Sequence, residues 1–573
     1  MAAPPDQPPN RTEPVTPPNR PSSGSGSGRL RIWAVEARTA VASRLSTNVS
    51  DFLADRQFLV WCLALAIGIG VAYAAISFRL LIGVVQLSWL GSRSENVFAA
   101  AAKVPWYVIL LAPAMGGLIV GTLLHRFLPG RRAPGVADVI EARALGDCKI
   151  PVVQGLWGAT LSILSLGFGA SAGREGPVVH LGATLASWLE DRFQLSQGAR
   201  RTLLASGAAA AVSASFNAPM AGVLFAHEVI LAHYALRAFV PIVIASVAGA
   251  IIARIHLGNF PAFTVPEYSI TSYLEFPAFA LLGVTCAVVA IVFELALMTT
   301  ERVAWSFKLP LWARPAIGGL MVGAIAVFFP QVLGVGYDAT GMALTQQFEL
   351  WLLLALIVAK TAATSITLAS RFAGGVFSPS LYLGAMTGCA FGFIATSAFP
   401  EMASSNGLYA LLGAGAVAGA VLGAPISSTL IVFELTGGYN MTIALLLTVS
   451  IAHGLTQAAL GHSYFHWQLT KRGLSLQEGP HKEIMRRLNV SDFMTPLDAD
   501  EPPPIAPDPD EDPWLTPSDT LEQALRTFDR DGVTRIAVVS ASDTTRVVGW
   551  ADRLIAISTF NRELIQSHEE EHK

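Results

Sequence analysis

The sequence predicts an all-α polytopic membrane protein with a small α/β segment after the membrane region. Of the 573 residues, 52% are hydrophobic and only 14% are charged, against about 25% charged residues in ordinary soluble proteins. Apolar segments also follow one another almost without pause from residue 58 to about residue 460. The formal net charge of -3 provides no basic field, so we expect no nucleic-acid partner.

The first 50 residues predict a disordered cytoplasmic tail. They are rich in Pro, Ser and Gly and lack the apolar stretch of a secretory signal. Four arginines stand shortly before the first apolar segment, namely Arg29, Arg31, Arg38 and Arg44. Because basic residues beside a membrane segment favour the cytoplasmic side, we expect the N-terminus inside the cell.

Residues 51–466 form the predicted transmembrane domain, and their apolar segments fall into two length classes. The long ones can cross roughly 30 Å of hydrocarbon; they are 58–78, 107–128, 276–297 and 351–370. The short ones have only about a dozen residues between Gly, Asn or Pro; they are 178–189, 203–213, 219–231 and 424–435. Broken or re-entrant helices of this kind are tolerated only beside protein or a water-filled cavity, and in transporters they surround the central site.

One sequence frame occurs twice in this domain. A glycine is followed four residues later by a proline, and four residues after that by Leu-Gly-Ala. A second repeated pattern further along the chain also aligns without gaps between its two copies. Glycine and alanine matches alone could reflect close helix packing, but the prolines and glutamates indicate two related halves. The matching pairs are Gly173 and Gly375, Pro219 and Pro425, and Glu228 and Glu434.

The first copy of the frame carries two charges, Arg174 and Glu175, inside mostly apolar sequence. Charged groups at membrane depth cost several kcal/mol, so they usually bind something or line a polar path. A short helix that begins at Gly or Pro leaves its first N–H groups unbonded, and these can bind a small anion without a lysine. We therefore predict a transport site for a small anion. A phosphate or carboxylate substrate would be expected to recruit bidentate arginines, and only Arg174 is placed for that. Such helix starts follow Pro134-Gly135, lie at 173–177 and 375–379, and occur near Pro219 and Pro425.

No catalytic or metal-binding pattern accompanies these motifs in the sequence. The four cysteines are scattered without zinc spacing, and His180, His227 and His233 lack the spacing of metal ligands. We therefore expect no cofactor and no enzymatic activity. A membrane-embedded enzyme and a non-transporting sensor are the remote alternatives, and neither would carry anions into liposomes.

Together these motifs resemble the CLC family of chloride channels and anion/proton exchangers over residues 56–466. The motifs are Gly173-Arg174-Glu175-Gly176-Pro177, Gly375-Val376-Phe377-Ser378-Pro379, Phe216-Asn217-Ala218-Pro219 and Pro134-Gly135. The resemblance implies an inverted repeat of tilted and re-entrant helices in the lipid bilayer of a cell membrane, with both termini cytoplasmic. It also implies a homodimer with one pathway for chloride or nitrate in each subunit.

The resemblance also assigns roles to particular residues. Glu175 becomes the gate, because its carboxylate would compete with the permeant anion for the pathway. An ion pair with Arg174 is the structural alternative for this glutamate. Tyr464 and Phe465 both remain candidates for the family's anion-contacting tyrosine. The implied anion-binding residues are Pro134, Gly135, Arg174, Gly176, Val376, Phe377, Tyr464 and Phe465.

Two departures from the family pattern bear on mechanism. Pro134 stands where a serine is usual, which resembles the nitrate-preferring branch. Val229 stands where exchangers carry a proton-accepting glutamate, which resembles the channel branch and favours passive conduction. The alternative is a chloride/proton antiporter with a substitute proton relay, for which His227 and Glu228 are the nearby candidates. Glu228 could instead simply connect two helices.

The chain becomes polar in its C-terminal part, where residues 467–513 predict a linker and residues 514–573 a single small motif. The motif resembles one CBS module, and since such modules work in pairs, a second copy would have to come from the other subunit. An adenine nucleotide is a weakly supported candidate partner, with Asp552 as its only sequence signal. The predicted elements are helices at 518–530 and 551–564 and strands at 534–539 and 546–550.

Overall fold

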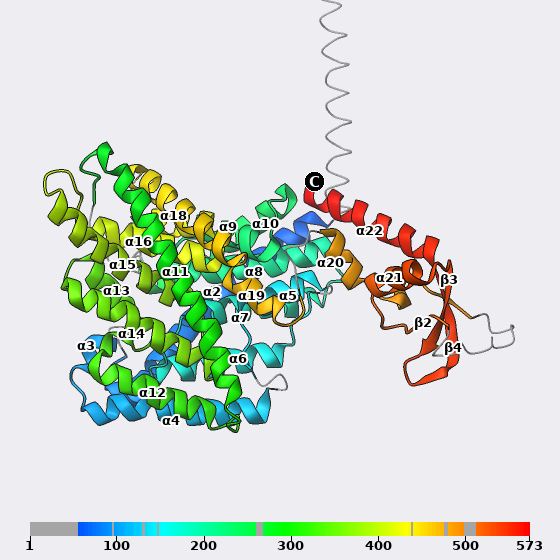
Figure 1. Ribbon diagram of the computed structural model, residues 1–573, viewed down its shortest axis with the longest axis horizontal. Coiled ribbons are helices and arrows are strands. Elements are labelled where there is room, and N and C mark those ends of the chain that lie inside the picture. Colours follow the sequence, from blue (N-terminus) through cyan, green and yellow to red (C-terminus); the bar gives the residue numbers. More distant parts are fainter. Residues whose placement is uncertain are drawn as a thin grey trace, which may run out of the picture. The chain divides into compact units, whose positions relative to one another are not determined.

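The computed structural model describes residues 56–93, 97–128, 132–145, 148–258, 268–436, 439–474, 480–497 and 512–572. The predicted N-terminal tail (1–50) lies outside the described residues, as does the Pro- and Asp-rich stretch 498–511. Within the described part, seven helices are long and apolar enough to cross a membrane. This confirms the prediction of a polytopic, mainly helical membrane protein (Figure 1).

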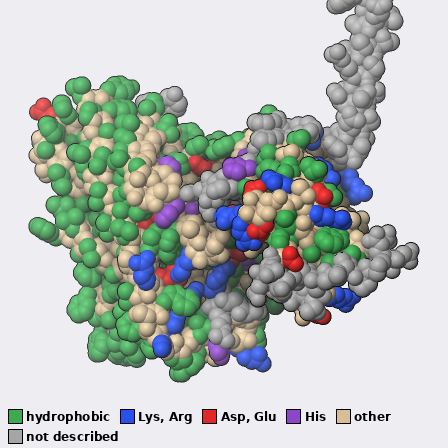
Figure 2. All heavy atoms as spheres, turned by 45° about the vertical axis from the view of Figure 1, so that its right-hand side comes forward, with side chains coloured by type: hydrophobic (Ala, Val, Ile, Leu, Met, Phe, Trp, Pro, Cys, Tyr) green, Lys and Arg blue, Asp and Glu red, His purple; other side chains and the backbone are tan. Residues whose placement is uncertain are grey.

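The long helices consist largely of Leu, Ile, Val and Ala. Hydrophobic side chains cover much of the visible surface of these helices (Figure 2). Pro113 and Pro241 lie inside α4 and α10, where neighbouring helices can compensate for the missing hydrogen bonds. The long helices are α2 (Gln57–Leu90), α4 (Trp106–Phe127), α10 (Leu236–Leu257), α11 (Phe276–Ser306), α14 (Leu350–Ala369), α15 (Phe377–Ala398) and α18 (Tyr439–Leu460).

The remaining membrane-domain helices are shorter, and two of them begin at predicted breaks. α9 (Pro219–Phe225) and α17 (Pro425–Thr436) start at their prolines, because a first-turn proline leaves no additional N–H group unpaired. α9 continues directly into a π-helical segment, η1 (Ala226–Leu231). The others are α3 (Val97–Ala101), α5 (Val136–Ala144), α6 (Val152–Gly167), α7 (Glu175–Glu190), α8 (Gln197–Phe216), η2 (Tyr273–Glu275), α12 (Arg314–Phe328), η3 (Pro330–Val332), α13 (Tyr337–Leu344), α16 (Asn406–Leu422) and α19 (Tyr464–Thr470).

One predicted short segment is longer than expected. Residues 203–213 lie inside α8, which continues for 20 residues. Its first turn is polar and includes Arg200 and Arg201, so a search for apolar runs misses its beginning. The Ser196 hydroxyl accepts a hydrogen bond from a first-turn amide, and Asn217 ends the helix in the left-handed conformation with φ 59°.

The two copies of the repeated frame meet backbone to backbone. The Gly173 amide donates to the carbonyl oxygen of Gly375 at 2.7 Å, and the Gly375 amide donates back to Gly173 at 2.8 Å. Further along, α7 approaches α8 so closely that a Cβ atom at Gly182 would lie 2.5 Å from the carbonyl oxygen of Gly207. The matching glycines bring α15 against α16 in the second half. These paired contacts are those expected of a two-fold repeat.

A four-stranded sheet follows the membrane helices in the chain. Its strand order is β1-β4-β3-β2; β2 pairs with β3 in parallel, and the other neighbours are antiparallel. The strands are β1 (Thr495–Pro496), β2 (Trp514–Leu515), β3 (Arg535–Ser540) and β4 (Asp543–Asp552). The accompanying helices are α20 (Pro480–Arg487), η4 (Val490–Asp492), α21 (Leu521–Asp531) and α22 (Arg553–His572).

The core of this C-terminal unit begins earlier in the chain than the predicted motif. Ile484, Leu488 and Phe493 share one apolar cluster with Phe528 of α21. Residues in the range predicted as a linker (467–513) therefore belong to the folded unit. The two edge strands of the sheet, β1 and β2, have only two residues each, which is too short for an alternating pattern to be visible in the sequence.

Candidate anion pathway

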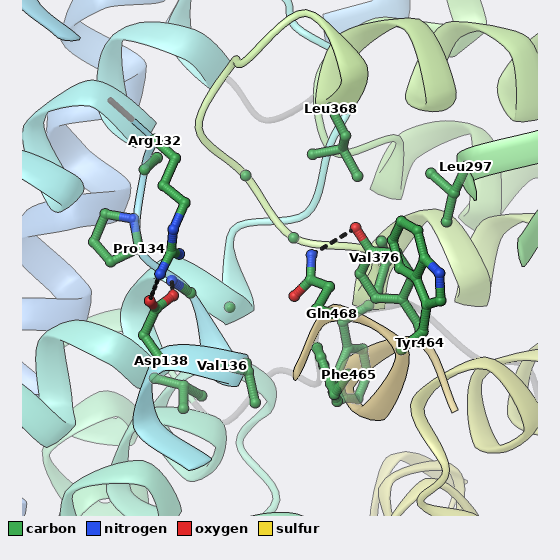
Figure 3. A pocket seen from close by; sticks show the side chains of 18 of the residues that line it. Arg132, Pro134, Val136, Asp138, Leu297, Leu368, Val376, Tyr464, Phe465 and Gln468 are labelled. Carbon is green, nitrogen blue, oxygen red and sulfur yellow. Dashed lines mark hydrogen bonds and ion pairs between the residues drawn. The ribbon is translucent and has the colours of Figure 1, made fainter. Parts of the chain in front are cut away.

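A cavity of about 270 Å³ opens among helix ends that are far apart in the sequence. Its walls come from the loop before α5, the starts of α7 and α15, the C-terminal half of α11, and α19 (Figure 3). The exposed fraction of the side chains is 45% at Lys471, 22% at Arg472 and 1% at Glu175. Lys471 and Arg472 therefore mark the mouth of the cavity, and Glu175 marks its buried end.

Most of the residues predicted from the sequence line this single cavity. Among the predicted gating and anion-binding residues, Arg174 is the exception, since it lines a second, smaller hollow together with Arg79 and Ser215. The predicted relay residues His227 and Glu228 do not line the cavity either. Pro134 stands on one side of the cavity, with Tyr464 and Phe465 across from it (Figure 3). The lining residues from the predicted set are Pro134, Gly135, Glu175, Gly176, Val376, Phe377, Tyr464 and Phe465.

The Glu175 carboxylate is held by two hydroxyl groups at the buried end of the cavity. The Tyr337 hydroxyl donates to one carboxylate oxygen, and the Ser378 hydroxyl donates to the other at 2.5 Å. Arg174 gives little direct support, because its Nε atom lies 3.8 Å from Glu175 Oε1 and its guanidinium lies 4.8 Å from the centre of the Tyr337 ring. The carboxylate thus fills the place where two hydroxyl donors converge.

Tyr337 and Ser378 are site residues that the sequence reasoning did not single out. Ser378 stands inside the second copy of the repeated frame, and a search of that frame for hydroxyl donors could have found it. Tyr337 comes from α13, 162 residues beyond Glu175 in the chain. No local motif marks it, because only the tertiary structure brings α13 to Glu175.

The loop before α5 is organised by Asp138. Its carboxylate accepts hydrogen bonds from the Gly135 amide at 2.8 Å and from Arg132 at 2.6 Å, and Arg472 approaches to 3.2 Å. The Gly135 N–H group is therefore engaged by this carboxylate. Pro134 has no N–H group, so the helix starts of α7 and α15 are the better source of backbone donors for an anion.

Tyr464 and Phe465 both line the cavity, so this position does not distinguish between the two candidates for the anion-contacting tyrosine. Both residues are in the first turn of α19 and both side chains are largely buried. The Tyr464 hydroxyl accepts a hydrogen bond from Gln468 at 2.9 Å (Figure 3). The tyrosine hydroxyl therefore has a protein partner one turn along its own helix.

The candidate proton carriers have other partners. Nδ1 of His227 lies 3.0 Å from the carbonyl oxygen of His233. Glu228 accepts hydrogen bonds from the amides of Ile426 and Ser427 at 3.0 and 2.8 Å. Its carboxylate thus caps the start of α17, the helix-connecting role considered as an alternative. A relay role for His227 or Glu228 stays a prediction.

A buried carboxylate that the sequence reasoning missed lies near the same cavity. Glu294 of α11 has no exposed surface, and neither carboxylate oxygen has a hydrogen-bond partner among the described residues. It precedes Leu297 by one helical turn and Glu301 by two, and both of these line the cavity. In the sequence it is one acidic residue in a long apolar run, and only the structure shows which side it faces.

Comparison with known proteins identifies the family. The family described as voltage gated chloride channel matches residues 116–457. A ClcB-like chloride channel protein of Ralstonia nicotianae is 34% identical over 389 residues, covering 66% of this chain and 90% of the relative. The H(+)/Cl(-) exchange transporter ClcA of Vibrio cholerae is 29% identical over 454 residues, covering 76% of this chain and 94% of the relative.

Solved structures agree with this assignment. The structure of a slow cyanobacterial Cl-/H+ antiporter matches with a TM-score of 0.63 and 25% identity, covering 73% of this chain and 99% of that one. A eukaryotic CLC transporter, at 18% identity and a TM-score of 0.60, shares the fold over 88% of this chain and 89% of its own. The chain belongs to the voltage-gated chloride channel (CLC) family. It is therefore an integral membrane protein for anion transport and not an enzyme.

Proposed function

We propose that this protein conducts small monovalent anions, chloride and nitrate, passively through the cavity, and that Glu175 is the gate. The observation that carries the proposal is the position of the Glu175 carboxylate between the hydroxyls of Tyr337 and Ser378 at the buried end. When the carboxylate is protonated or swings away, the two hydroxyls become donors for an anion. The gate and the permeant anion thus compete for one set of partners.

Passive conduction is favoured over coupled exchange by the residues around Val229. Its side chain cannot titrate, and it stands where exchangers carry a second glutamate. The adjacent Glu228 carboxylate is already engaged by two amides at the start of α17. Protonation of this carboxylate would weaken the helix cap, which makes Glu228 an unfavourable proton carrier.

Chloride/proton exchange is the second candidate, and one observation favours it. Relatives and a structural neighbour are described as H(+)/Cl(-) exchange transporters or antiporters. Glu294 is a fully buried carboxylate on the cavity face of α11 with no hydrogen-bond partner among the described residues. Glu294 shares a helix face with Leu297 and Glu301, which line the cavity, so under this alternative it would be the substitute relay.

Purified protein in liposomes distinguishes the two candidates. Under passive conduction, a chloride gradient drives anion flux but no uphill proton movement. Chloride-driven proton pumping would overturn the channel proposal. In that case Glu294→Gln should abolish proton flux and spare chloride flux, with Glu301→Gln on the same helix as the matched control. His227→Ala tests the remaining predicted relay in the same assay.

We also propose that the protein is a homodimer in the cell membrane with both termini in the cytoplasm. The family assignment and the arginines before the first membrane segment support this arrangement. The domain boundaries, the pairing of two CBS-like units across the dimer and adenine-nucleotide binding stay proposals. Asp552 offers little to a nucleotide, because its carboxylate accepts a hydrogen bond from the Leu554 amide at 2.8 Å and caps α22.

A further inference from the structure

Arg371 adopts a backbone conformation that normally favours glycine. It follows the end of α14 with φ 72°, and its amide donates to the carbonyl oxygen of Leu368 at 3.1 Å. This is the helix-ending position at which glycine is usual, because a side chain there is strained. Seven described non-glycine residues have positive φ, and of these Arg371 is the one that lines the cavity.

The Arg371 side chain lies at the mouth of the cavity beside an aromatic ring. Its guanidinium carbon lies 4.9 Å from the centre of the Trp305 ring, and Trp305 also lines the cavity. Lys471 Nζ lies 5.8 Å from the same ring. A guanidinium held against an aromatic face keeps a defined orientation, so its N–H donors are fixed at the mouth.

In the described part of the chain, the other basic residues of the mouth form ion pairs with carboxylates, whereas Arg371 forms none. Arg132 pairs with Asp138, Arg472 pairs with Asp138 and Glu141, and Lys471 pairs with Glu301 at 2.7 Å. Among the residues that the structure describes, no ion pair or hydrogen bond holds the Arg371 guanidinium.

The electrostatic surroundings of Arg371 are unfavourable for its charge. Burial lowers the pKa of its guanidinium, Glu301 opposes this effect, and Arg132, Arg314 and Arg472 add to it. An arginine stays charged nevertheless. This half-buried cation has a strained backbone and like-charged neighbours, and its guanidinium stands against one aromatic ring. Among the described residues it has no ion-pair or hydrogen-bond partner, so an anion can bind it.

The dipole of α14 explains why a cation is favourable near position 371, but it does not explain the whole arrangement. The C-terminus of α14 favours a nearby cation. A basic residue in the last turn of the helix would gain the same interaction without the left-handed conformation. The dipole therefore does not explain why an arginine occupies this glycine-type position and faces the cavity.

We propose that Arg371 is an anion-binding residue at the cavity mouth, where its guanidinium receives the permeant anion before it reaches the site near Glu175. The planar pair of N–H donors matches two oxygen atoms of a planar oxyanion. The site should therefore bind nitrate more tightly than chloride. This inference rests on the proposed anion pathway. It adds a binding site at the mouth of the cavity that prefers nitrate to chloride.

Binding of nitrate and chloride to the full-length protein in detergent, measured by calorimetry, tests this inference. Arg371→Gly suits the backbone conformation and removes the guanidinium. We expect nitrate affinity to fall by about tenfold or more, because the variant loses both charge-assisted N–H donors, while the melting temperature stays the same or rises. Arg371→Lys keeps the charge without the planar donors, so nitrate should lose more affinity than chloride.

Arg314→Gln is the matched control. Arg314 lies 5.4 Å from the centre of the same Trp305 ring but does not line the cavity, so its replacement should leave both affinities unchanged. Unchanged nitrate affinity in Arg371→Gly, or an equal loss in Arg314→Gln, would overturn the inference. The pH dependence of flux in Arg371→Gly liposomes tests the Glu175 gate separately, so the pathway proposal can survive failure of the Arg371 site.

Discussion

The two halves of the membrane domain are alike in their scaffold and different at the pathway. Glu228 of the first half caps α17 of the second half through the amides of Ile426 and Ser427. Glu434 returns the same contact to α9, accepting hydrogen bonds from the amides of Met220 and Ala221 at 2.9 and 2.8 Å. The two exchanged caps match in residue type, in repeat position and in their pairs of amide donors, and Glu228 also accepts a hydrogen bond from the Ser427 hydroxyl at 2.5 Å.

The starts of α7 and α15 occupy matching places in the repeat but carry different chemistry. α7 starts at a carboxylate, Glu175, whereas α15 starts at Phe377 and carries the hydroxyl of Ser378. The second helix start therefore supplies a donor to the acceptor on the first. The comparison indicates that symmetry is kept where it supports the fold and lost at the proposed anion pathway.

The largest expected effect comes from removing the carboxylate that distinguishes the start of α7 from the start of α15. Glu175→Gln removes the titrating group at the start of α7 but keeps its shape. Flux controlled by one protonation can change by up to about tenfold per pH unit, and the variant should lose most of that dependence. Anion flux from liposomes across a pH series measures it. A wild-type pH profile in the variant would show that Glu175 is not the gate.

A second prediction concerns the Tyr337 hydroxyl, which would hold the proposed Glu175 gate closed. Tyr337→Phe removes one hydrogen bond to a charged group, worth about 1.5–3 kcal/mol. The carboxylate should leave its site more easily, so flux near neutral pH should rise by roughly tenfold or more. Tyr382→Phe is the control, since the Tyr382 hydroxyl is buried without a hydrogen-bond partner among the described residues. Equal flux in both variants would argue against the Tyr337 hydroxyl holding the Glu175 carboxylate in place.

A smaller effect is expected at Pro134, which belongs to the first half of the membrane domain and lines the cavity. Pro134→Ser adds a hydroxyl donor, and a neutral hydrogen bond contributes about 0.5–1.5 kcal/mol. Because a hydroxyl favours the smaller, harder anion, the nitrate-to-chloride flux ratio should fall by about two- to tenfold. Competition between the two anions in one liposome assay measures this ratio. An unchanged ratio would remove Pro134 from the residues that set selectivity.

The smallest effect on transport is expected at the symmetric caps. Glu228→Gln and Glu434→Gln should each lower the free energy of unfolding by about 1 kcal/mol, because each weakens one helix cap, and each should leave anion flux unchanged. Thermal unfolding in detergent and liposome flux give the two readings. A flux or proton defect confined to Glu228→Gln would break the equivalence of the caps and support a relay role for Glu228.

Local backbone and solvation rules made much of the framework predictable. The prolines of α9 and α17 end one helix and start another for reasons that act within a few residues. The length and polarity of apolar segments follow from the thickness of the bilayer. The full extent of α8 escaped prediction, because its polar first turn does not resemble a membrane segment.

The sequence by itself determined the membrane class, the two-fold repeat and the position of a charged group at a helix start, because these depend on local composition and spacing. Only the tertiary structure decided which partners that group has. Tyr337 reaches Glu175 from a distant helix, Glu228 and Glu434 exchange caps between halves, and Arg371 faces the cavity without an acidic partner among the described residues. Hydrogen bonds and charges act through space, so their partners depend on how the helices pack.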